Sequence, residues 1–463
     1  MRIDLFFWSA FAFIVMVSGC RKDPADSDSN PYKYNSSWTE ASHEKRIPDY
    51  ERIFPQSKIN SIEISLTPTQ WNSIQSNMSL LFGIPFGAAL NNFPQNIPDT
   101  DPEYVDVNVR FEDRNWKNVG FKLRGKKMLG DIWNDGIYKL PFHLNFDKFE
   151  DQTPAIKNQR LYGFKEISFN PGYKDPSLLH EKLASDIFNM GGIAAPQTAF
   201  YKVYINFGAG TKYCGVYCAT ELPEDNFLLD NFDENLGNIY KPTSTLNLFR
   251  EEEFIKKNNK GIDDFSDVQQ LIKVLNSPSR ISNPALWHTD IGRVFNVEQF
   301  VKWLAISNAM VNLGGYGTSA ENYYLYHHSN GKFFWIPWDN NEAMSSSPGI
   351  VGPNGGNSNY GLSLSMNEVT ANWPLIRYLM DDPDYFQLYK NNLRSFNNTY
   401  FGSSDINLLI DKYYDLITDA VSGIEGEQPK YTLLTSNAAF LNERANLKNH
   451  FSNRYQMIRS YAP

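Results

Sequence analysis

Residues 296–341 carry the pattern that is most easily tied to chemistry. A helix, a polar loop and a hairpin are predicted there in order, and the hairpin ends in Pro337-Trp338-Asp339. Such a unit can serve metal-dependent phosphoryl transfer, because the loop can supply a carboxylate and an amide while the hairpin delivers a second carboxylate to Mg²⁺. The loop, however, reads Asn312-Leu313-Gly314-Gly315-Tyr316-Gly317 and holds no carboxylate where this chemistry would place one.

Four charged residues outside this unit could complete a phosphate-binding site. Three stand at the start or end of a predicted strand, namely Arg124, Lys139 and Glu221, and Lys241 stands in a compact turn predicted over 237–242. Taken singly, each is as easily a surface charge or a member of an ion pair. Taken in order with an Asn and the Asp of the hairpin, they fit a site in which cations hold phosphates, a Glu orients a Lys, and Asn and Asp hold Mg²⁺.

Several familiar sites are excluded. The sequence has no Gly-x-x-x-x-Gly-Lys-Ser/Thr phosphate loop and no His-Glu-x-x-His zinc helix, because His180-Glu181 is followed by Ala184 where the second His should stand. The Gly-rich run at 352–356 lacks the Lys and Ser/Thr of a phosphate loop and predicts a surface loop. The formal net charge of -9 argues against nucleic acid as a partner.

The elements that must position these residues are predicted from periodicity. Alternating apolar residues predict strands over 62–66, 105–111, 119–123, 142–146, 200–205, 213–219, 323–326 and 333–336. Helices are predicted to begin at Pro68, at Asp175-Pro176, at Asn296 and beyond Trp373, and residues 231–284 are expected to form a helical insertion. This order predicts an α+β fold with a β-rich N-terminal part and a helical C-terminal part, in two lobes of one unit.

Cysteines and aromatic residues add two smaller expectations. Cys214 and Cys218 fall in one predicted strand, where a four-residue offset separates Cα atoms by roughly 13 Å, so a disulfide between them is excluded and buried free thiols are expected. Aromatic residues make up 15% of the chain, which suits either a thick core or a surface that binds sugars or a partner.

The N-terminus predicts export. Arg2 precedes an apolar run over 5–17, which is shorter than the roughly 20 residues that span a bilayer and fits the core of a signal peptide. Ser18-Gly19-Cys20 resembles the lipobox of bacterial lipoproteins, in which the Cys is lipidated; an ordinary signal peptide with a chance Cys is the alternative. We therefore expect a signal peptide at 1–19, a polar tether at 20–48, and a protein anchored through Cys20 in the cell envelope, facing the periplasm or the cell surface.

The folded part resembles the CotH kinase family, the atypical protein-kinase-like proteins named after spore coat protein H. The matching stretches are 119–125, 139–142, 146–149, 158–164, 237–242, 322–326 and 336–339. We assign residues 49–463 to this domain. The resemblance implies an atypical kinase-like fold and ATP- and Mg²⁺-dependent transfer of phosphate to protein Ser or Thr.

The resemblance also implies roles for individual residues. Asp339 matches the metal-binding Asp, and Asn322 is a candidate second metal ligand. The four charged residues named above become candidates for the nucleotide site. The departure is at Gly314, which stands where the family pattern has its catalytic Asp. The missing carboxylate would have accepted the proton of the substrate hydroxyl, a contribution of about 10²- to 10⁴-fold.

Three functions remain open from the sequence. The first is a degenerate kinase, or pseudokinase, that keeps Mg-ATP while phosphoryl transfer is weakened or lost. The second is a non-enzymatic envelope module that binds a glycan or a protein partner. The third is an active kinase with a substitute base, for which Glu321 and Glu342 are near enough in sequence.

Overall fold

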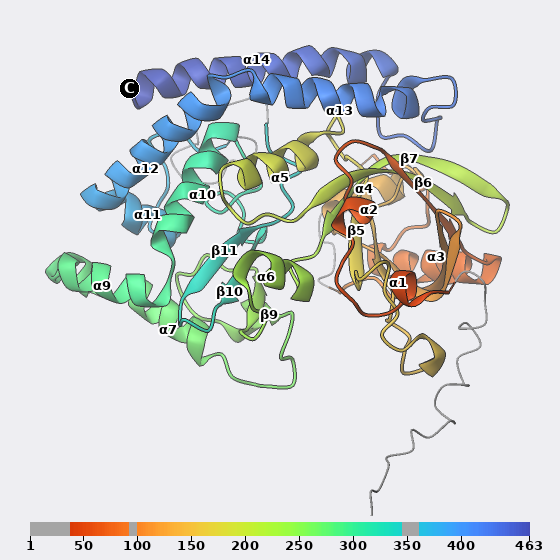
Figure 1. Cartoon of the computed structure of the whole chain (residues 1–463), viewed down its shortest axis with the longest axis horizontal. Helices are drawn as coiled ribbons and strands as arrows, with labels where there is room; N and C mark the ends of the chain where they lie inside the picture. The colour runs from red at the N-terminus through yellow and green to blue at the C-terminus, as the bar shows by residue number, and fades with distance from the viewer. Residues whose placement is uncertain (1–37, 92–99, 345–360) are drawn as a thin grey trace, which may run out of the picture.

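Seven strands close into a barrel in the first half of the chain (Figure 1). The computed structural model describes residues 38–91, 100–344 and 361–463. The strands run around the barrel in the order β1-β2-β3-β4-β5-β7-β6, and β6 closes it by pairing in parallel with β1. Their bounds are β1 (Asn60–Ser65), β2 (Val105–Phe111), β3 (Arg114–Leu123), β4 (Phe142–Asn145), β5 (Glu166–Asn170), β6 (Thr198–Asn206) and β7 (Thr211–Glu221).

The barrel core follows the predicted alternation. Every second residue of β2 from Val107 to Phe111 is buried, because successive side chains of a strand point to opposite faces. Helix α3 (Pro68–Phe82) packs against β2 and begins with the expected capping box, in which Thr67 and Gln70 each bond the other's backbone. The strand-then-helix start of the fold is therefore confirmed.

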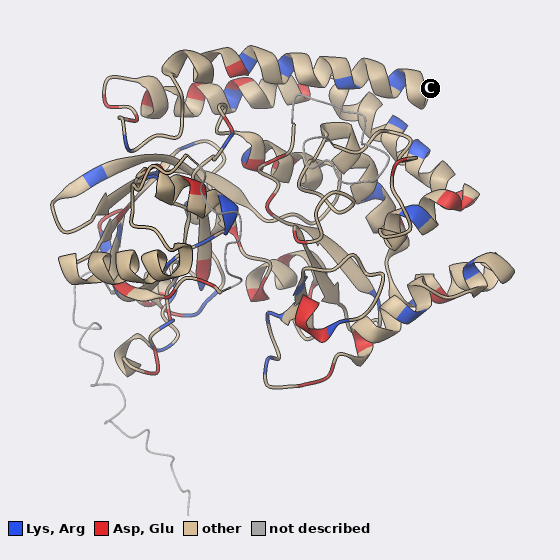
Figure 2. Cartoon of the chain, turned by 180° about the vertical axis from the view of Figure 1, so that it is seen from behind, with Lys and Arg blue, Asp and Glu red and all other residues tan. Residues whose placement is uncertain are grey.

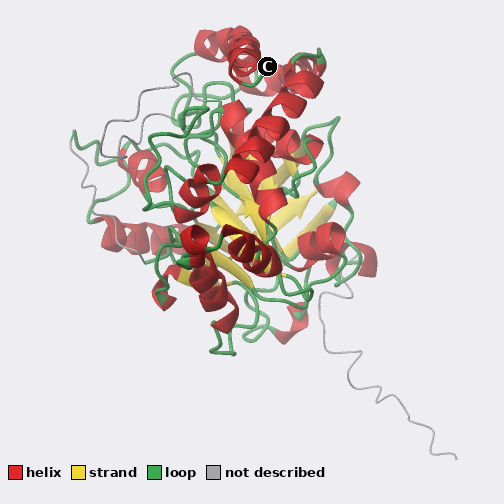
Figure 3. Cartoon of the chain, turned by 90° about the vertical axis from the view of Figure 1, so that its left-hand side faces the viewer, coloured by secondary structure: helices red, strands yellow, loops and turns green. Residues whose placement is uncertain are grey.

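A second sheet and most of the helices form the other part of the molecule (Figure 1). In a view turned by 90°, helices lie around the strands (Figure 3). The sheet has the order β11-β10-β8-β9. Its strands are β8 (Ile239–Pro242), β9 (Phe254–Lys256), β10 (Tyr323–His327) and β11 (Phe333–Pro337). The helices after β7 are α6 (Asp225–Phe232), α7 (Ser266–Leu275), α8 (Ser279–Ser282), α9 (Pro284–Val294), α10 (Val297–Met310), α11 (Pro374–Asp381), α12 (Pro383–Phe396), α13 (Asp405–Ser422) and α14 (Asn437–Tyr461).

Besides α3, four of the described helices belong to the barrel half or connect it to the second part: α1 (Glu40–His43), α2 (Tyr50–Ile53), α4 (Lys127–Asn134) and α5 (His180–Met190). Helix α10 packs against α5, α12, α14 and β11, so it stands at the centre of the second part. Its side chains are buried on nearly every side, and the Asn296 side chain caps its first turn as predicted. The α+β architecture with a β-rich start and a helical end is confirmed.

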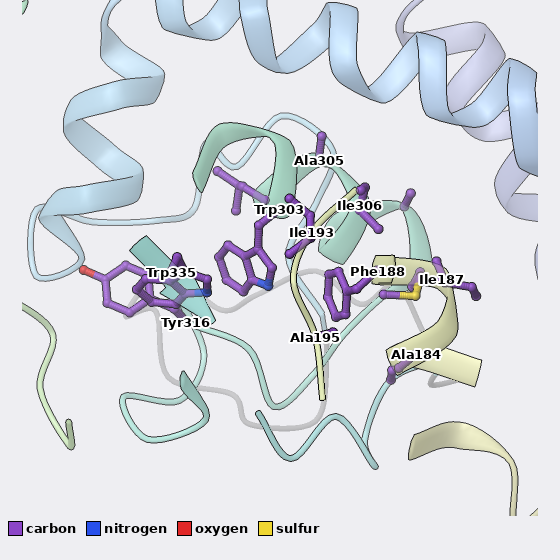
Figure 4. Packing of buried hydrophobic residues seen from close by; sticks show 14 of the residues in the cluster. Ala184, Ile187, Phe188, Ile193, Ala195, Trp303, Ala305, Ile306, Tyr316 and Trp335 are labelled. Carbon is purple, nitrogen blue, oxygen red and sulfur yellow. The ribbon is translucent and has the colours of Figure 1, made fainter. Parts of the chain in front are cut away.

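The aromatic surplus fills the cores. Trp335 of β11 stacks on Tyr323 with 4.0 Å between ring centroids. The ring centroid of Trp303 of α10 lies 4.8 Å from that of Trp335 (Figure 4). Five tryptophans are fully buried: Trp116, Trp133, Trp287, Trp303 and Trp335. Of the two uses considered for the aromatic residues, these side chains therefore serve the core.

The last residues of the predicted tether pack on the barrel instead. Thr39 caps α1, and the buried ring of His43 lies 4.3 Å from the ring of Trp116 and bonds the carbonyl of Asn115. The imidazole of His43 stacks on the indole of Trp116 and so packs this segment against the barrel, which the polar composition of the segment did not predict. The signal peptide, Cys20, the rest of the tether and the Gly-rich run at 352–356 lie outside the described residues.

Three element predictions were wrong. The helix expected from Asp175 begins at His180, because the Asp175 carboxylate accepts from the backbone N–H groups of Ser177 and His180 and so forms a turn before the helix. The stretch 231–284 is not only helical, since it supplies β8 and β9 to the second sheet. The segment 237–242, predicted to be a compact turn, is mostly strand β8.

Charge is distributed over the whole molecule. Basic and acidic residues are interspersed on both parts (Figure 2). Among the described helices, none combines the length and the apolar character needed to cross a membrane. Cys214 and Cys218 are buried and free on β7, as expected, and burial raises the pKa of each thiol.

Candidate active site

Asp339 stands two residues after the end of β11, where the second sheet meets the barrel. Its backbone φ is 53°, a left-handed conformation that Asp adopts more readily than most residues. Arg124 at the end of β3 donates from Nη2 to Oδ2 of Asp339 over 3.0 Å, and from Nη1 to Oγ of Ser168 on β5 over 2.8 Å. An arginine of the barrel therefore holds the carboxylate of the second sheet, and only 24% of the Asp339 side chain is exposed.

Lys241 brings a second cation from β8. The pKa of Lys241 is lowered to about 8, mainly by burial and then by the charge of Arg124, while the carboxylate of Asp339 acts in the opposite direction. Since such effects are strong only at short range, the three groups share one environment. Arg124 and Lys241 thus bring two cations to this place, and cations of this kind can bind phosphate oxygens.

The loop after α10 carries Gly314 and Asn322 to the same place. Tyr316 anchors this loop in the core, with its ring centroid 5.4 Å from that of Trp335. A Cβ atom added to Gly314 would stand 2.9 Å from Nδ2 of Asn322 and 3.7 Å from the backbone oxygen of Asp339. The loop and the Asp339 segment therefore lie side by side, with a glycine at their junction.

Glu181 belongs to this site although the sequence pointed to it only as an incomplete zinc motif. Its side chain is buried in the first turn of α5, and one carboxylate oxygen accepts from the backbone N–H of Asn340. Burial raises the pKa of Glu181, and the charge of Asp339 raises it further. The sequence signal that could have shown Glu181 to face inward is helical spacing, because position 181 lies on the same face of the helix as the apolar Ala184 and Phe188.

Glu221 points away from the cluster. The register of β5 and β7 pairs Ile167 with Glu221 and Ser168 with Thr220. Ile167 belongs to the barrel core, whereas Ser168 contacts Arg124, and neighbouring residues of a strand face opposite sides. Glu221 accepts instead from the hydroxyl of Tyr50 over 2.7 Å, and burial raises its pKa to about 7. The expectation that Glu221 orients a Lys at the nucleotide site is not met by these contacts.

Lys139 is also engaged elsewhere. Its Nζ donates to Oε1 of Glu427 over 2.6 Å, and the side chains of the pair are 0% and 1% exposed. The same oxygen accepts from the backbone N–H of Val216 on β7. Among the described contacts, none joins Lys139 to Arg124 or Asp339, so the structure gives Lys139 a place in the packing between the barrel and the segment after α13.

Oxygen donors near Asp339 suit Mg²⁺, the metal that the family pattern implies. The carboxylate of Asp339 and the amide of Asn322 are hard oxygen ligands of the kind that Mg²⁺ takes. Oε2 of Glu181 is buried and has no hydrogen-bond partner among the described residues, and such an orphaned acceptor is satisfied by a cation or by water. The residues present therefore fit the metal.

A second acidic group lies elsewhere and has a structural role. His288, Asp382 and Asp384 bring their side chains within 4.8 Å of one another. Asp382 is the N-cap of α12 and accepts from two backbone N–H groups of its first turn. The positive end of the helix already satisfies that carboxylate and disfavours a cation beside it.

Comparisons with known proteins agree with the pattern in the sequence. A likeness to the inner spore coat protein H of Bacillus subtilis (strain 168) reaches 28% identity over 280 residues, or 57% of this chain and 68% of that protein. Two solved structures are more distant, at 11% identity each. One is the HipA–HipB toxin–antitoxin complex with operator DNA from Shewanella oneidensis MR-1, with a TM-score of 0.31 over 64% of this chain and 59% of that chain.

The other solved structure is the proinflammatory kinase CtkA of Helicobacter pylori, with a TM-score of 0.25 over 69% of this chain and 95% of that chain. Both TM-scores are low, and neither likeness assigns a role to a residue of this chain. The family model described as CotH kinase protein matches residues 128–458, a range that holds Lys241, Gly314, Asn322 and Asp339 and begins shortly after Arg124. With most of its length in that match, this chain belongs to the CotH kinase protein family.

Proposed function

We propose that this protein binds Mg-ATP between the barrel and the second sheet and transfers the terminal phosphoryl group to a hydroxyl of a protein substrate. The observation that carries the proposal is the 3.0 Å ion pair between Arg124 and Asp339 beside the loop that holds Asn322, and the charges of both residues also act on Lys241. Asp339, Asn322 and Glu181 would hold the metal, and the two cations would hold phosphate oxygens. Bound Mg²⁺ would neutralise charge on the phosphates.

The ion pair between Arg124 and Asp339 suits a site that awaits its ligand. Without a metal, the guanidinium neutralises a mostly buried carboxylate that would otherwise lack a counter-charge. When a nucleotide is present, phosphate oxygens can take over the guanidinium and the cation can take over the carboxylate. Each charged group then exchanges one partner for another, which limits the cost of opening the pair.

Calorimetric titration with a non-hydrolysable ATP analogue tests the nucleotide site. We expect saturable binding with Mg²⁺ present and much weaker binding in EDTA, because Asp339 and Asn322 contact the nucleotide through the metal. Absence of binding under both conditions would refute the proposal. Incubation with radiolabelled ATP and dephosphorylated casein then tests the transfer itself.

Binding of the analogue should weaken as the pH rises above about 8, the pKa of Lys241 in the free protein. A phosphate beside the ammonium group raises this pKa, so at a pH above the pKa of the free protein Lys241 must take up a proton when the nucleotide binds. Below that pH Lys241 is already charged in the free protein, so it contributes no pH dependence to the affinity. Affinity should fall by up to about tenfold per pH unit above that point. The measurement is the dissociation constant of Mg-analogue as a function of pH.

The matched control for that profile is Lys241→Arg, because a guanidinium stays charged throughout this range. The variant should bind with little change above pH 8. An equal loss of affinity in the variant and the parent protein would assign the pH dependence to another group.

We also propose, as the sequence suggests, that the protein is lipid-anchored in the cell envelope through Cys20. Mass spectrometry of the mature N-terminus would detect the lipid on that residue, and an unmodified or uncleaved terminus would refute the anchor. The alternative of a glycan-binding module is less well supported by the aromatic content, since many of the described large aromatic side chains are buried in the cores.

A further inference from the structure

A carboxylate stands beside the glycine that replaces the expected catalytic Asp. The three atoms nearest to the point where a Cβ of Gly314 would stand are Nδ2 of Asn322, the backbone oxygen of Asp339 and Oε2 of Glu342. Glu342 Oε2 lies 3.7 Å from that point. The described residues therefore place a carboxylate oxygen at the position that the loop itself leaves without one.

The backbone holds Glu342 against the loop. The N–H of Leu313, next to Gly314, donates to the backbone oxygen of Glu342 over 3.3 Å. The N–H of Ala343 donates to the oxygen of Asn340 over 3.0 Å, which fixes the turn on which Glu342 stands. The distance between the carboxylate and position 314 thus depends on ordered backbone on both sides.

Resting on the proposed phosphoryl transfer, we propose that Glu342 is a catalytic residue that supplies the carboxylate missing at position 314. It accepts the hydrogen bond of the acceptor hydroxyl and takes its proton. A Glu side chain is one methylene longer than an Asp side chain, so a carboxylate rooted in the neighbouring segment can reach the place that an Asp at 314 would fill. Burial, with the nearby charge of Asp339, also raises the pKa of Glu342, which makes its carboxylate a better proton acceptor.

The step balances as an ordinary phosphoryl transfer. The acceptor oxygen forms a bond to the γ-phosphorus, and the bond from that phosphorus to the bridging oxygen breaks, so ADP leaves with the electron pair. The hydroxyl proton passes to Glu342 and then to solvent. No oxidant, reductant or further reactant is needed.

The other acidic residues near the loop fit this role less well. Glu321 is exposed, and it lies just before β10. Glu181 is buried and bonded to the backbone of Asn340, which suits a metal ligand. Glu342 is the acidic side chain among the three atoms nearest to position 314.

A swap of the carboxylate between positions 342 and 314 tests the inference. Gly314 does not have a positive φ, so its backbone accepts an Asp once the amide of Asn322, the end of a flexible side chain, shifts slightly. The full-length protein is compared with Glu342→Gln, Gly314→Asp and the double variant, and Glu321→Gln is the matched control. Two rates are measured: Mg²⁺-dependent ATP hydrolysis, in which water is the acceptor, and transfer to dephosphorylated casein.

We expect Glu342→Gln to lower both rates by about 10²-fold or more. Its affinity for the Mg²⁺-loaded ATP analogue should stay within about threefold of the parent, because a proton acceptor contributes little to nucleotide binding. Gly314→Asp should restore activity in the double variant, and Glu321→Gln should match the parent. Rescue of this kind would not follow from a merely structural role for Glu342.

The failures of the two proposals are distinguishable. An active parent with an equally active Glu342→Gln variant overturns the role of Glu342 and leaves the kinase function standing. An inactive parent that binds Mg-analogue, with activity only after Gly314→Asp, shows a degenerate kinase and overturns the role as well. Loss of nucleotide affinity or of folding in Glu342→Gln without rescue by Gly314→Asp assigns Glu342 to metal binding or structure. Absence of nucleotide binding in the parent overturns both proposals.

Discussion

Asp339→Asn is expected to abolish the effect of Mg²⁺ on nucleotide binding while the fold is preserved. Asn tolerates the left-handed backbone conformation found at this position, so the substitution changes charge with little backbone strain. Loss of one member of a buried charged pair costs about 2–5 kcal/mol, which corresponds to a loss of at least about 30-fold in affinity with Mg²⁺. Calorimetric titration with the non-hydrolysable analogue measures this loss.

The same titration in EDTA tests whether Asp339 contributes to nucleotide binding through the metal or independently of it. Without metal, Asp339 repels phosphate and occupies Arg124, so Asp339→Asn should bind the free nucleotide at least as tightly as the parent. Asp113→Asn is the matched control, since that side chain is 84% exposed at the barrel hairpin and should behave like the parent. Equal Mg²⁺ dependence in Asp339→Asn and the parent would remove Asp339 from the metal site.

Local signals explain what could be predicted of the fold. The alternation in β2 and the capping box of α3 depend on neighbouring residues and are visible in the sequence. Closure of the barrel is not visible in the sequence, because Ile62 of β1 pairs with Val203 of β6 and no local pattern encodes such a distant partner. Strand β8 was predicted to be a turn because it is only four residues long and directly follows the polar Asn238. A strand of that length shows too little alternation to be recognised in the sequence.

The candidate site likewise has residues that could be predicted from the sequence and residues that could not. Asp339 and Gly314 could be placed from motif and spacing, because the loop and the hairpin adjoin in sequence as they do in space. Glu181 was missed as a member of this site, since it reaches Asp339 only through the packing of α5. The facing of Glu221 could not be read from the sequence, because it depends on the register between β5 and β7, and a shift of one residue reverses the face.

Lys139 gives the second large prediction, and the expected effect is on stability. Its Nζ and Oε1 of Glu427 form an almost fully buried ion pair between residues 288 positions apart. Lys139→Met would leave an uncompensated buried carboxylate, which costs about 3–5 kcal/mol in the free energy of unfolding. Urea denaturation followed by circular dichroism measures that loss. Lys127→Met is the control, because the ion pair of Lys127 with Asp131 has a lysine that is 64% exposed and should contribute below about 1 kcal/mol.

A double-mutant cycle separates this structural role from the nucleotide role that the family pattern implied for Lys139. Glu427→Gln removes the charge and keeps an oxygen that can accept from the N–H of Val216. Lys139→Met with Glu427→Gln should therefore recover part of the stability lost in Lys139→Met, because no unpaired charge stays buried. If Lys139 serves the fold, the folded double variant binds the Mg²⁺-loaded ATP analogue like the parent. A folded double variant that has lost nucleotide binding would return Lys139 to the active site and would show that the ion pair with Glu427 opens when nucleotide binds.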